Sequence, residues 1–334
     1  MPRSIFTSSA VFAALALAAG TSCAQGPHGH AASLPLPALA FPKGTSVVEL
    51  PFVERRNHIV VEAGIEGKGR LPCTLDTGAR GTVLFGDSLV RALGLVPAGE
   101  ARVKGVGAGE ATAASLYTGV HVALGGLQLS DLAIVAMPDS SVSIKPMKGS
   151  LALGRGLWEQ VVAEIDWDTH RVRLHDPAAW HYAGHGAVVP LSFDAGGTPF
   201  VVASVTLPGG QPFDVRLVLD TGASHPLQLE PGTDPRIVAP RGERRKIGHG
   251  ASGQVFGTVG TATFTLGGVT FRDLPVTYPD ASLNLPASGR RQGNLGSGLL
   301  RRFHVILDYP HQQMILEPGP HVNDPVTLPD YDAD

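Results

Sequence analysis

The tetrapeptide Asp-Thr-Gly-Ala occurs twice in this chain, at Asp76–Ala79 and again 144 residues later at Asp220–Ala223. Each copy directly follows an apolar run, Leu71–Leu75 in the first case and Val215–Leu219 in the second. One copy alone is typical of a surface turn after a strand, because Asp, Thr and Gly all suit such turns. Two copies in matching surroundings favour a shared role instead.

The two tetrapeptides belong to a longer internal repeat. Four further landmarks recur in the same order at offsets of 141 to 142 residues. They are Val47–Phe52 with Val188–Phe193, Leu124–Gly126 with Leu266–Gly268, Leu153–Gly154 with Leu295–Gly296, and Ile165–Trp167 with Leu307–Tyr309. A repeat of this length predicts two lobes of one design.

The composition favours an all-β fold. The 334 residues include 42 Gly and 27 Pro, whereas average usage would give about 23 Gly, and few segments show a helical period. Many short strands joined by tight turns are the expected result. We expect strands at 58–65 and 200–207, and a hairpin closing each lobe at 161–174 and 303–316.

Asp76 and Asp220 can serve as a catalytic pair. Hydrolysis of a peptide bond by water needs one group to take a proton from the water and another to give one to the carbonyl oxygen. Two carboxyl groups held close together cannot both ionise, so one acts as the base and the other as the acid. Glycines would let the backbone approach this pair, and threonine hydroxyls can bond across to the opposite lobe. These supporting residues are Thr77, Gly78, Thr221 and Gly222.

The sequence resembles the aspartic peptidases of the pepsin and retropepsin type. Asp-Thr-Gly-Ala is the retropepsin form of the active-site loop, and Gly293–Phe303 followed by Ile306–Tyr309 is similar to the end of bacterial retropepsin-like proteins. The resemblance covers most of residues 45–318. It implies two similar acid-protease (pepsin-like) β-barrel lobes, with the active-site cleft between them, acting as an endopeptidase on an extended peptide or protein substrate. Retropepsins dimerise to reach this geometry, whereas this chain carries both halves, so we expect a monomer.

The resemblance also implies flaps over the cleft. The candidates are glycine-rich, as in retropepsins, and lack the Tyr of pepsin-type flaps. They are Gly105, Val106 and Gly107 in the first half, and Gly248, His249 and Gly250 in the second. Arg80 follows the first tetrapeptide where Ser224 follows the second, and we expect it at the outer edge of the loop. A peptide-binding protein that kept this fold without turnover is the alternative, and a chaperone-like or envelope-assembly role stays open.

Other chemistries lack their residues. The 13 His form no His-Glu-x-x-His pattern, so neither a metal site nor any other cofactor is expected. No Gly-x-Ser-x-Gly elbow precedes a helix. Charged residues make up 16% of the chain without a run of five like charges, which argues against nucleic-acid binding. Asp166 and Asp308 also repeat, but their place in the closing hairpins favours a structural turn role.

The first 24 residues read as a signal peptide. A positive start is followed by an apolar stretch at 11–19 and by Ser22-Cys23-Ala24, a small-residue cleavage site. We therefore expect a periplasmic or secreted protein cleaved near Ala24, with acylation at Cys23 the less favoured reading. No segment is long and apolar enough to span a membrane. The remaining Cys73 should be a small buried hydrophobe.

The expected organisation has five parts after the signal peptide. They are an exposed linker at 25–44, an N-terminal lobe at 45–177, an inter-lobe linker at 178–187, a C-terminal lobe at 188–320 and a tail at 321–334.

Overall fold

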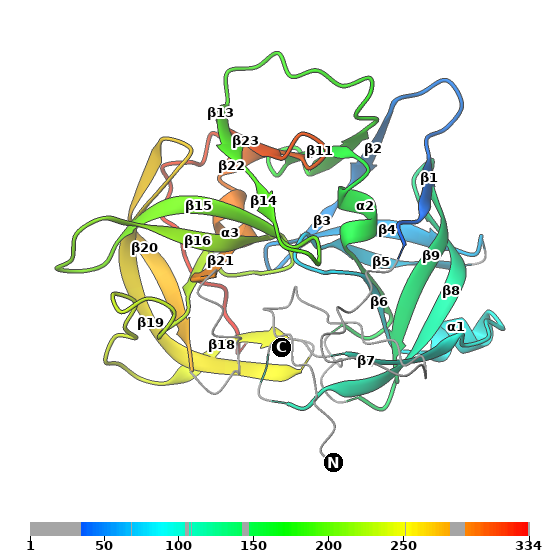
Figure 1. The fold of residues 1–334 in the computed structure, drawn as a ribbon, viewed down its shortest axis with the longest axis horizontal. Coiled ribbons are helices and arrows are strands. Elements are labelled where there is room, and N and C mark those ends of the chain that lie inside the picture. The colour runs from blue at the N-terminus through cyan, green and yellow to red at the C-terminus, as the bar shows by residue number, and fades with distance from the viewer. Residues whose placement is uncertain are drawn as a thin grey trace.

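The computed structural model describes residues 35–332, except 68, 104–106, 108, 142–146, 251 and 281–290. The expected signal peptide and two flap candidates, Gly105 and Val106, lie outside the described residues. Within them the protein consists almost entirely of β-strands, arranged in two lobes and one sheet that joins the lobes (Figure 1). The all-β, two-lobed prediction is confirmed. No helix in the described ranges is long and apolar enough to cross a membrane.

The N-terminal lobe is a nine-stranded sheet with the order β1-β9-β6-β10-β5-β4-β8-β7 and with β3 paired to β4. Its strands are β1 (Ala38–Ala40), β3 (Val53–Arg55), β4 (His58–Ile65), β5 (Gly69–Leu75), β6 (Thr82–Phe85), β7 (Gly99–Val103), β8 (Thr112–Leu124), β9 (Leu127–Met137) and β10 (Ser150–Leu153). β1 lies within the segment expected to be an exposed linker, where it pairs with β9.

The C-terminal lobe is an eight-stranded sheet with the order β14-β15-β16-β21-β17-β20-β19-β18. Its strands are β14 (Ser192–Phe193), β15 (Pro199–Thr206), β16 (Phe213–Asp220), β17 (Leu227–Leu229), β18 (Arg245–Gly250), β19 (Gly253–Leu266), β20 (Val269–Pro279) and β21 (Gly293–Gly296). The described residues also contain three short helices, α1 (Ser88–Ala92), α2 (Arg155–Trp158) and α3 (Ser297–Leu300).

Each lobe contains a closed barrel. In the N-terminal lobe the pairing runs β4–β5–β10–β6–β9–β8 and returns to β4. In the C-terminal lobe it runs β15–β16–β21–β17–β20–β19 and returns to β15. Both barrels therefore place the strand that leads into Asp-Thr-Gly parallel to the strand that carries the Leu-Gly pair. The two barrels have the same order of strand pairing.

Alternating burial explains why these segments form barrels. In β4 the side chains of Ile59, Val61, Ala63 and Ile65 are buried, while the residues between them face outward. Cys73 is fully buried on β5, as expected for a small hydrophobe. One continuous cluster of buried apolar side chains extends from Val48 to Leu316 and includes residues of both lobes.

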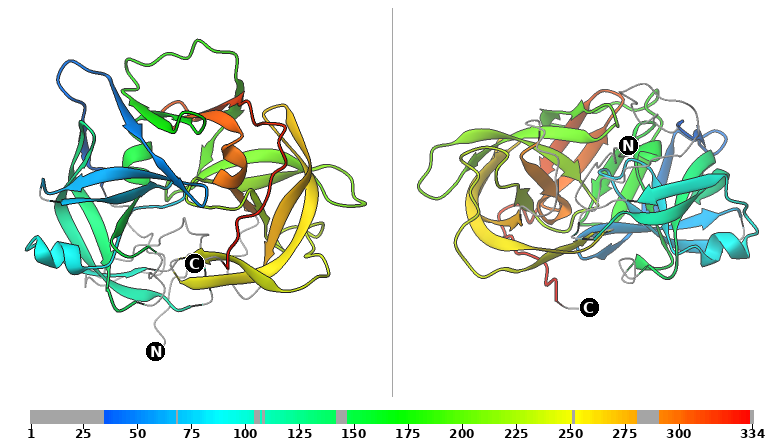
Figure 2. Two further views of the ribbon diagram at one scale, coloured as in Figure 1. Left: turned by 180° about the vertical axis from the view of Figure 1, so that it is seen from behind. Right: turned by 60° about the horizontal axis from the view of Figure 1, so that its bottom comes forward.

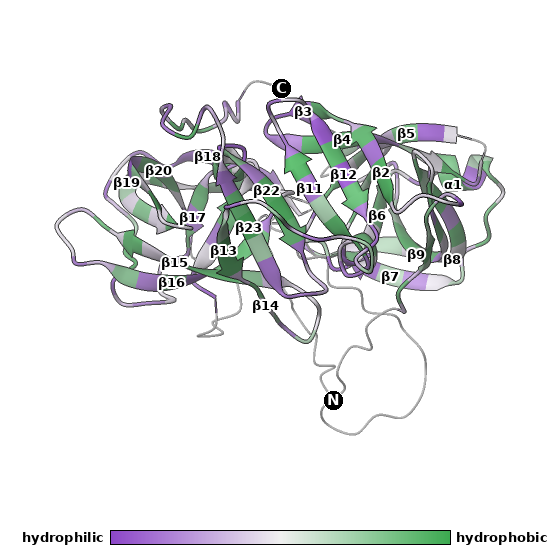
Figure 3. Ribbon diagram, turned by 90° about the horizontal axis from the view of Figure 1, so that it is seen from above, coloured by the Kyte–Doolittle hydropathy of each residue, from purple (hydrophilic) through white to green (hydrophobic). Residues whose placement is uncertain are grey.

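A six-stranded sheet joins the lobes, with the order β13-β23-β22-β11-β12-β2. Its strands are β2 (Val47–Pro51), β11 (Val162–Asp166), β12 (Arg171–His175), β13 (Ala187–Pro190), β22 (Phe303–Asp308) and β23 (Gln313–Pro318). Figure 3 looks down on this sheet, and apolar and polar residues alternate along its strands.

The two hairpins in this sheet correct one expectation. Each was expected to close its own lobe, but β11 of the first pairs with β22 of the second. The reason is that a hairpin alone leaves an edge of unpaired backbone groups, and pairing the two edges satisfies both. Glu164 lies opposite Ile306, its own equivalent 142 residues later, so the approximate two-fold axis of the repeat passes between them.

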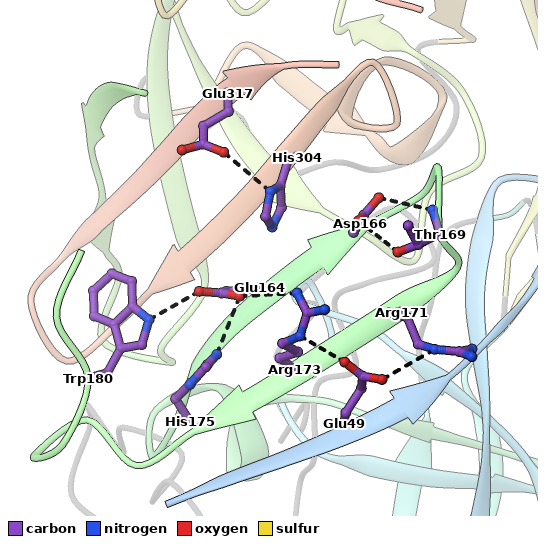
Figure 4. Close-up of polar contacts among 10 residues, drawn as sticks. All are labelled: Glu49, Glu164, Asp166, Thr169, Arg171, Arg173, His175, Trp180, His304 and Glu317. Atoms are coloured by element: carbon purple, nitrogen blue, oxygen red, sulfur yellow. Dashed lines mark hydrogen bonds and ion pairs between the residues drawn. The ribbon is translucent and has the colours of Figure 1, made fainter. Parts of the chain in front are cut away.

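Charged side chains cover this sheet (Figure 4). The Glu164 carboxylate accepts a hydrogen bond from Trp180 Nε1 at 3.2 Å and lies 3.5 Å from His175 Nε2. These contacts, the one with His175 foremost, lower the pKa of Glu164 to about 2. Arg173 lies between Glu164 and Glu49, at 3.7 Å and 2.8 Å from their carboxylate oxygens. These contacts hold together β2, β11 and β12 of the N-terminal half. Trp180 attaches the inter-lobe linker to the same group.

Residues 321–332, called the tail segment below, do not simply extend into solvent. Figure 2 shows this segment running from β23 down the back of the molecule. Arg302 donates hydrogen bonds to the carbonyl oxygens of His321 and Pro325. Val322 and Val326 pack against the main core cluster.

Candidate active site

The two Asp-Thr-Gly loops meet between the lobes. Asp76 directly follows β5, and Asp220 ends β16. Both side chains are fully buried. The loops come so close that a Cβ atom added to Gly222 would collide with the Asp76 carboxylate. Glycine is therefore required at this position by the partner aspartate itself.

Two threonines lock the loops together by exchanging hydrogen bonds. Thr77 Oγ1 donates to the Leu219 carbonyl at 2.8 Å and accepts from the Thr221 N–H at 2.9 Å. Thr221 Oγ1 donates to the Leu75 carbonyl at 2.7 Å and accepts from the Thr77 N–H at 3.0 Å. These four buried bonds all cross between the lobes, so the separation of the aspartates is fixed by the backbone of both loops.

The repeated Leu-Gly pairs support the loops from behind. A Cβ atom on Gly154 would collide with the Ala79 carbonyl, and one on Gly296 would collide with the His225 carbonyl. The chain that follows each Asp-Thr-Gly thus passes directly over the glycine of the parallel strand. This close approach explains why both motifs recur together in the repeat.

The aspartates have different hydrogen-bond partners. Asp76 Oδ1 accepts from the N–H groups of Gly78 and Ala79, both at 3.0 Å. Nothing in the described part of the chain bonds to Asp76 Oδ2. Asp220 Oδ1 accepts from the Gly222 N–H at 2.9 Å, and its Oδ2 accepts from Asn294 Nδ2 at 2.6 Å. Only Asp220 is held through both oxygens.

Asn294 breaks the symmetry of the repeat. It is fully buried on β21, and the equivalent residue of the N-terminal lobe is Ala152. The residues opposite them across the sheet differ in the same way, with Gln228 facing Asn294 and Val83 facing Ala152. The backing of Asp220 is therefore polar and that of Asp76 apolar.

This difference separates the protonation of the pair. Burial, followed by the neighbouring Asp220 charge, raises the pKa of Asp76 well above its ordinary value of 3.8. Burial raises the pKa of Asp220 to about 7, against the opposing effects of the Asn294 hydrogen bond and the Arg291 charge. The proton that the pair retains is thus favoured on Asp76, while Asp220 is the better carboxylate.

Two histidines near the second loop carry no charge at neutral pH. Burial lowers the pKa of His58 to about 4 and that of His225 to about 3. The neutral rings therefore place no positive charge beside the aspartates, and so they do not favour loss of the proton that the pair retains.

Arg80 points to the opposite lobe. Its Nη2 lies 2.6 Å from Asp194 Oδ2, and its Nε donates to Thr198 Oγ1 at 3.0 Å. The guanidinium charge is thus compensated by Asp194, in agreement with the expected place at the edge of the loop.

Asp166 and Asp308 serve turns. Asp166 accepts a hydrogen bond from Asp168. It also accepts hydrogen bonds from Thr169, which Figure 4 shows. Asp308 accepts from His311 and Gln313 in the turn between β22 and β23. The structural interpretation of both residues is confirmed.

The flap candidates that lie within the described residues belong to two hairpins that touch each other. Gly107 and Gly109 follow β7, and the Gly109 N–H donates to the Ser252 carbonyl of the opposite lobe at 2.8 Å. A Cβ atom on either glycine would collide with Ser252 backbone atoms. Gly248, His249 and Gly250 form the end of β18, paired with β19.

Sequence reasoning missed Asn294, His58 and His225. The only signal for Asn294 was a polar residue directly before the repeated Leu-Gly pair, within an otherwise apolar run. The two histidines gave no pattern. The described residues contain no group of three or more His, Cys, Asp or Glu that could hold a metal ion.

Comparison with known proteins agrees with this geometry. Residues 61–154 match the model of the aspartyl protease family. The structure is similar to that of an aspartic proteinase from Irpex lacteus, with a TM-score of 0.51 and 12% sequence identity, covering 84% of this chain and 100% of that one. At this identity the likeness establishes the pepsin-like fold. No curated protein sequence matches the chain.

Proposed function

We propose that this chain, which carries an aspartyl protease domain over residues 61–154 within a pepsin-like fold, is an aspartic endopeptidase. The observation that carries the proposal is the pair of buried aspartates whose two loops are held together by the reciprocal threonine bonds. Burying two carboxyl groups side by side costs stability, and such an arrangement is typical of functional sites.

The unequal surroundings assign a role to each aspartate. Asp220, whose ionised form is favoured by Asn294, takes a proton from the attacking water. Asp76, which retains the proton, donates it to the carbonyl oxygen of the peptide bond. The tetrahedral intermediate then collapses as Asp220 gives its proton to the amide nitrogen and the C–N bond breaks. One hydroxyl of the intermediate returns a proton to Asp76, which restores the starting protonation of the pair.

The substrate is a peptide or unfolded protein segment in extended conformation. We further propose that the protein acts as a monomer, because one chain supplies both loops, and that it works in the periplasm or outside the cell. Light scattering of active protein tests the first point, and fractionation of cells that express the full chain tests the second.

Pepstatin-sensitive cleavage tests the activity. The chain lacking residues 1–24 should cleave a denatured protein, and pepstatin should abolish the cleavage. Asp76→Asn protein, prepared in the same way, is the control for a contaminating peptidase. Binding of the peptide without cleavage under all conditions would favour the alternative, a peptide-binding protein that kept the fold.

A further inference from the structure

A pocket of about 590 Å³ lies between the lobes beside the catalytic loops. Thr74, two residues before Asp76, lines it from the N-terminal lobe. Ser224, four residues after Asp220, and His249 of the β18–β19 hairpin line it from the C-terminal lobe. A peptide that extends from the aspartates in this direction must therefore enter this pocket.

The pocket is strongly basic. Arg55, Arg56, Lys148 and Lys246 all line it, and its described lining includes no Asp or Glu, while Lys148 also pairs with Asp139 at 3.3 Å. We call it the basic pocket. Its cations come from both lobes, so their positive potential is concentrated on the space between the lobes.

The hairpin that carries the two arginines is fixed in place. Asn57, at the turn between β3 and β4, donates to the Ser224 carbonyl at 2.7 Å. Arg301 donates to Asn57 Oδ1 at 2.9 Å and pairs with Glu54 at 2.7 Å. These contacts bridge the lobes, and they hold the hairpin with Arg55 and Arg56 in place at the pocket.

The tail segment reaches the same pocket. Tyr331 is one of the lining residues, and burial raises the pKa of its hydroxyl. Asp330 and Asp332 flank it, and residues 321–332 contain three Asp and no Lys or Arg. The tail segment thus brings an aromatic side chain to the pocket, with an acid on either side of it in the sequence.

We propose that the basic pocket binds acidic peptide segments that carry an aromatic side chain between carboxylates, and that tail residues 329–332 occupy it when no substrate is bound. Carboxylates pair with arginine through strong charge-assisted hydrogen bonds, and an aromatic ring fills an apolar surface at little entropic cost. Val60, Pro72 and Phe85 supply that surface in the pocket. The proposal names the substrate class of the proposed peptidase and so rests on that function.

Binding can be measured without turnover. All proteins carry Asp76→Asn, so that no probe is cleaved. The probe is the fluorescein-labelled peptide Leu-Pro-Asp-Tyr-Asp-Ala-Asp, which copies the tail, and its matched control is Leu-Pro-Asn-Tyr-Asn-Ala-Asn. Fluorescence anisotropy gives Kd for the unaltered tail and for a chain of full length with Asp330→Asn, Tyr331→Ala and Asp332→Asn.

We expect the acidic peptide to bind the tail-substituted chain at least tenfold more tightly than the chain with its own tail, because an intramolecular competitor has been removed. In the tail-substituted chain, Arg55→Glu and Arg56→Glu should each weaken binding about tenfold. Arg272→Glu, an exposed arginine on β20 outside the pocket, should have no such effect.

Equal affinity for the acidic and the neutral peptide would overturn the charge recognition. Equal affinity with and without the tail substitutions would overturn the occupancy by residues 329–332. Because the assay needs no catalysis, either failure leaves the peptidase proposal standing. Conversely, an inactive enzyme that shows all the expected binding would overturn only the peptidase proposal.

Discussion

At the scale of single residues, the site depends on the different hydrogen-bond surroundings of two aspartates at equivalent positions of the repeat. Asp76 and Asp220 occupy matching positions of the repeat, yet only Asp220 receives a side-chain hydrogen bond, from Asn294. A symmetric pair would share its proton equally. Here one buried amide favours one arrangement of acid and base before any substrate binds.

Replacing either aspartate by Asn should remove nearly all turnover. The pair acts as a unit, so Asp76→Asn and Asp220→Asn should each lower kcat to less than a tenth, and the double variant should be scarcely worse. Initial rates on one fluorogenic peptide measure this. A single variant that kept more than a tenth of the activity, a loss of only about 1.4 kcal/mol, would contradict the assignment.

The same variants should be more stable above pH 4. Both carboxyl pKa values are raised by folding, from 3.8 to about 7 for Asp220 and well above 3.8 for Asp76. The folded state therefore holds protons that the unfolded state releases, and stability falls as pH rises from about 4 through these values. Melting curves from pH 4 to 8 should show a smaller fall for either Asn variant.

Asn294→Leu should move the acid limb of the pH–rate profile to higher pH. Loss of a hydrogen bond to a charged group costs about 1.5–3 kcal/mol, which corresponds to about one to two pH units. The acid limb reports protonation of the second carboxylate, which becomes easier without Asn294. Gln228→Leu is the matched control, because Gln228 lies opposite Asn294 in the sheet without a hydrogen bond to Asp220. An unchanged acid limb would exclude this role.

At the scale of elements, the sequence predicted those strands that depend on a local alternation of apolar and polar residues. The strand expected at 58–65 coincides with β4, because alternation along one strand is a local property. The contact of Asn294 with Asp220 depends instead on the parallel register of β16 and β21, which places Asn294 opposite Val218. The tail segment has no periodicity at all, and its contacts are made with Arg302 and the core cluster, which no local pattern of the segment indicates. Contacts between residues so far apart in the sequence cannot be predicted from any short segment of it.

The hydrogen bonds exchanged between the two loops should contribute several kcal/mol to the free energy of unfolding. Thr77→Val and Thr221→Val each remove one donor and one acceptor that serve the opposite lobe, and leave a buried carbonyl and N–H unpaired. We expect each variant to lower the free energy of unfolding by about 2–4 kcal/mol and to reduce kcat. Urea unfolding measures the first effect. Thr277→Val, another fully buried threonine with one long bond of 3.4 Å, should cost less than either.

At the scale of the whole molecule, the lobes share their structure. The six-stranded sheet takes three strands from each half of the chain, and the main core cluster contains residues of both. Neither lobe buries all of its apolar side chains, or pairs all of its strands, without the other. The boundary between the two repeats in the sequence is therefore not a boundary between independent units.

Unfolding should accordingly be a single transition. All three Trp residues, Trp158, Trp167 and Trp180, precede the C-terminal lobe, so tryptophan fluorescence reports the N-terminal half. Hydrogen exchange of peptides from β15 to β20 reports the other half. We expect coincident midpoints in urea from both measurements. Two separated midpoints would show that the lobes unfold independently.

The pairing of β11 with β22 has a consequence for the nascent chain. Synthesis delivers Asp166, the end of β11, long before Phe303, the start of β22. At about 5–20 residues per second, the interval lasts roughly 7 to 27 seconds. Throughout it, β11 presents an open edge that can pair with the same strand of another molecule. Misassembly between copies is therefore the hazard built into this architecture, and a holding chaperone has its clearest target at that edge.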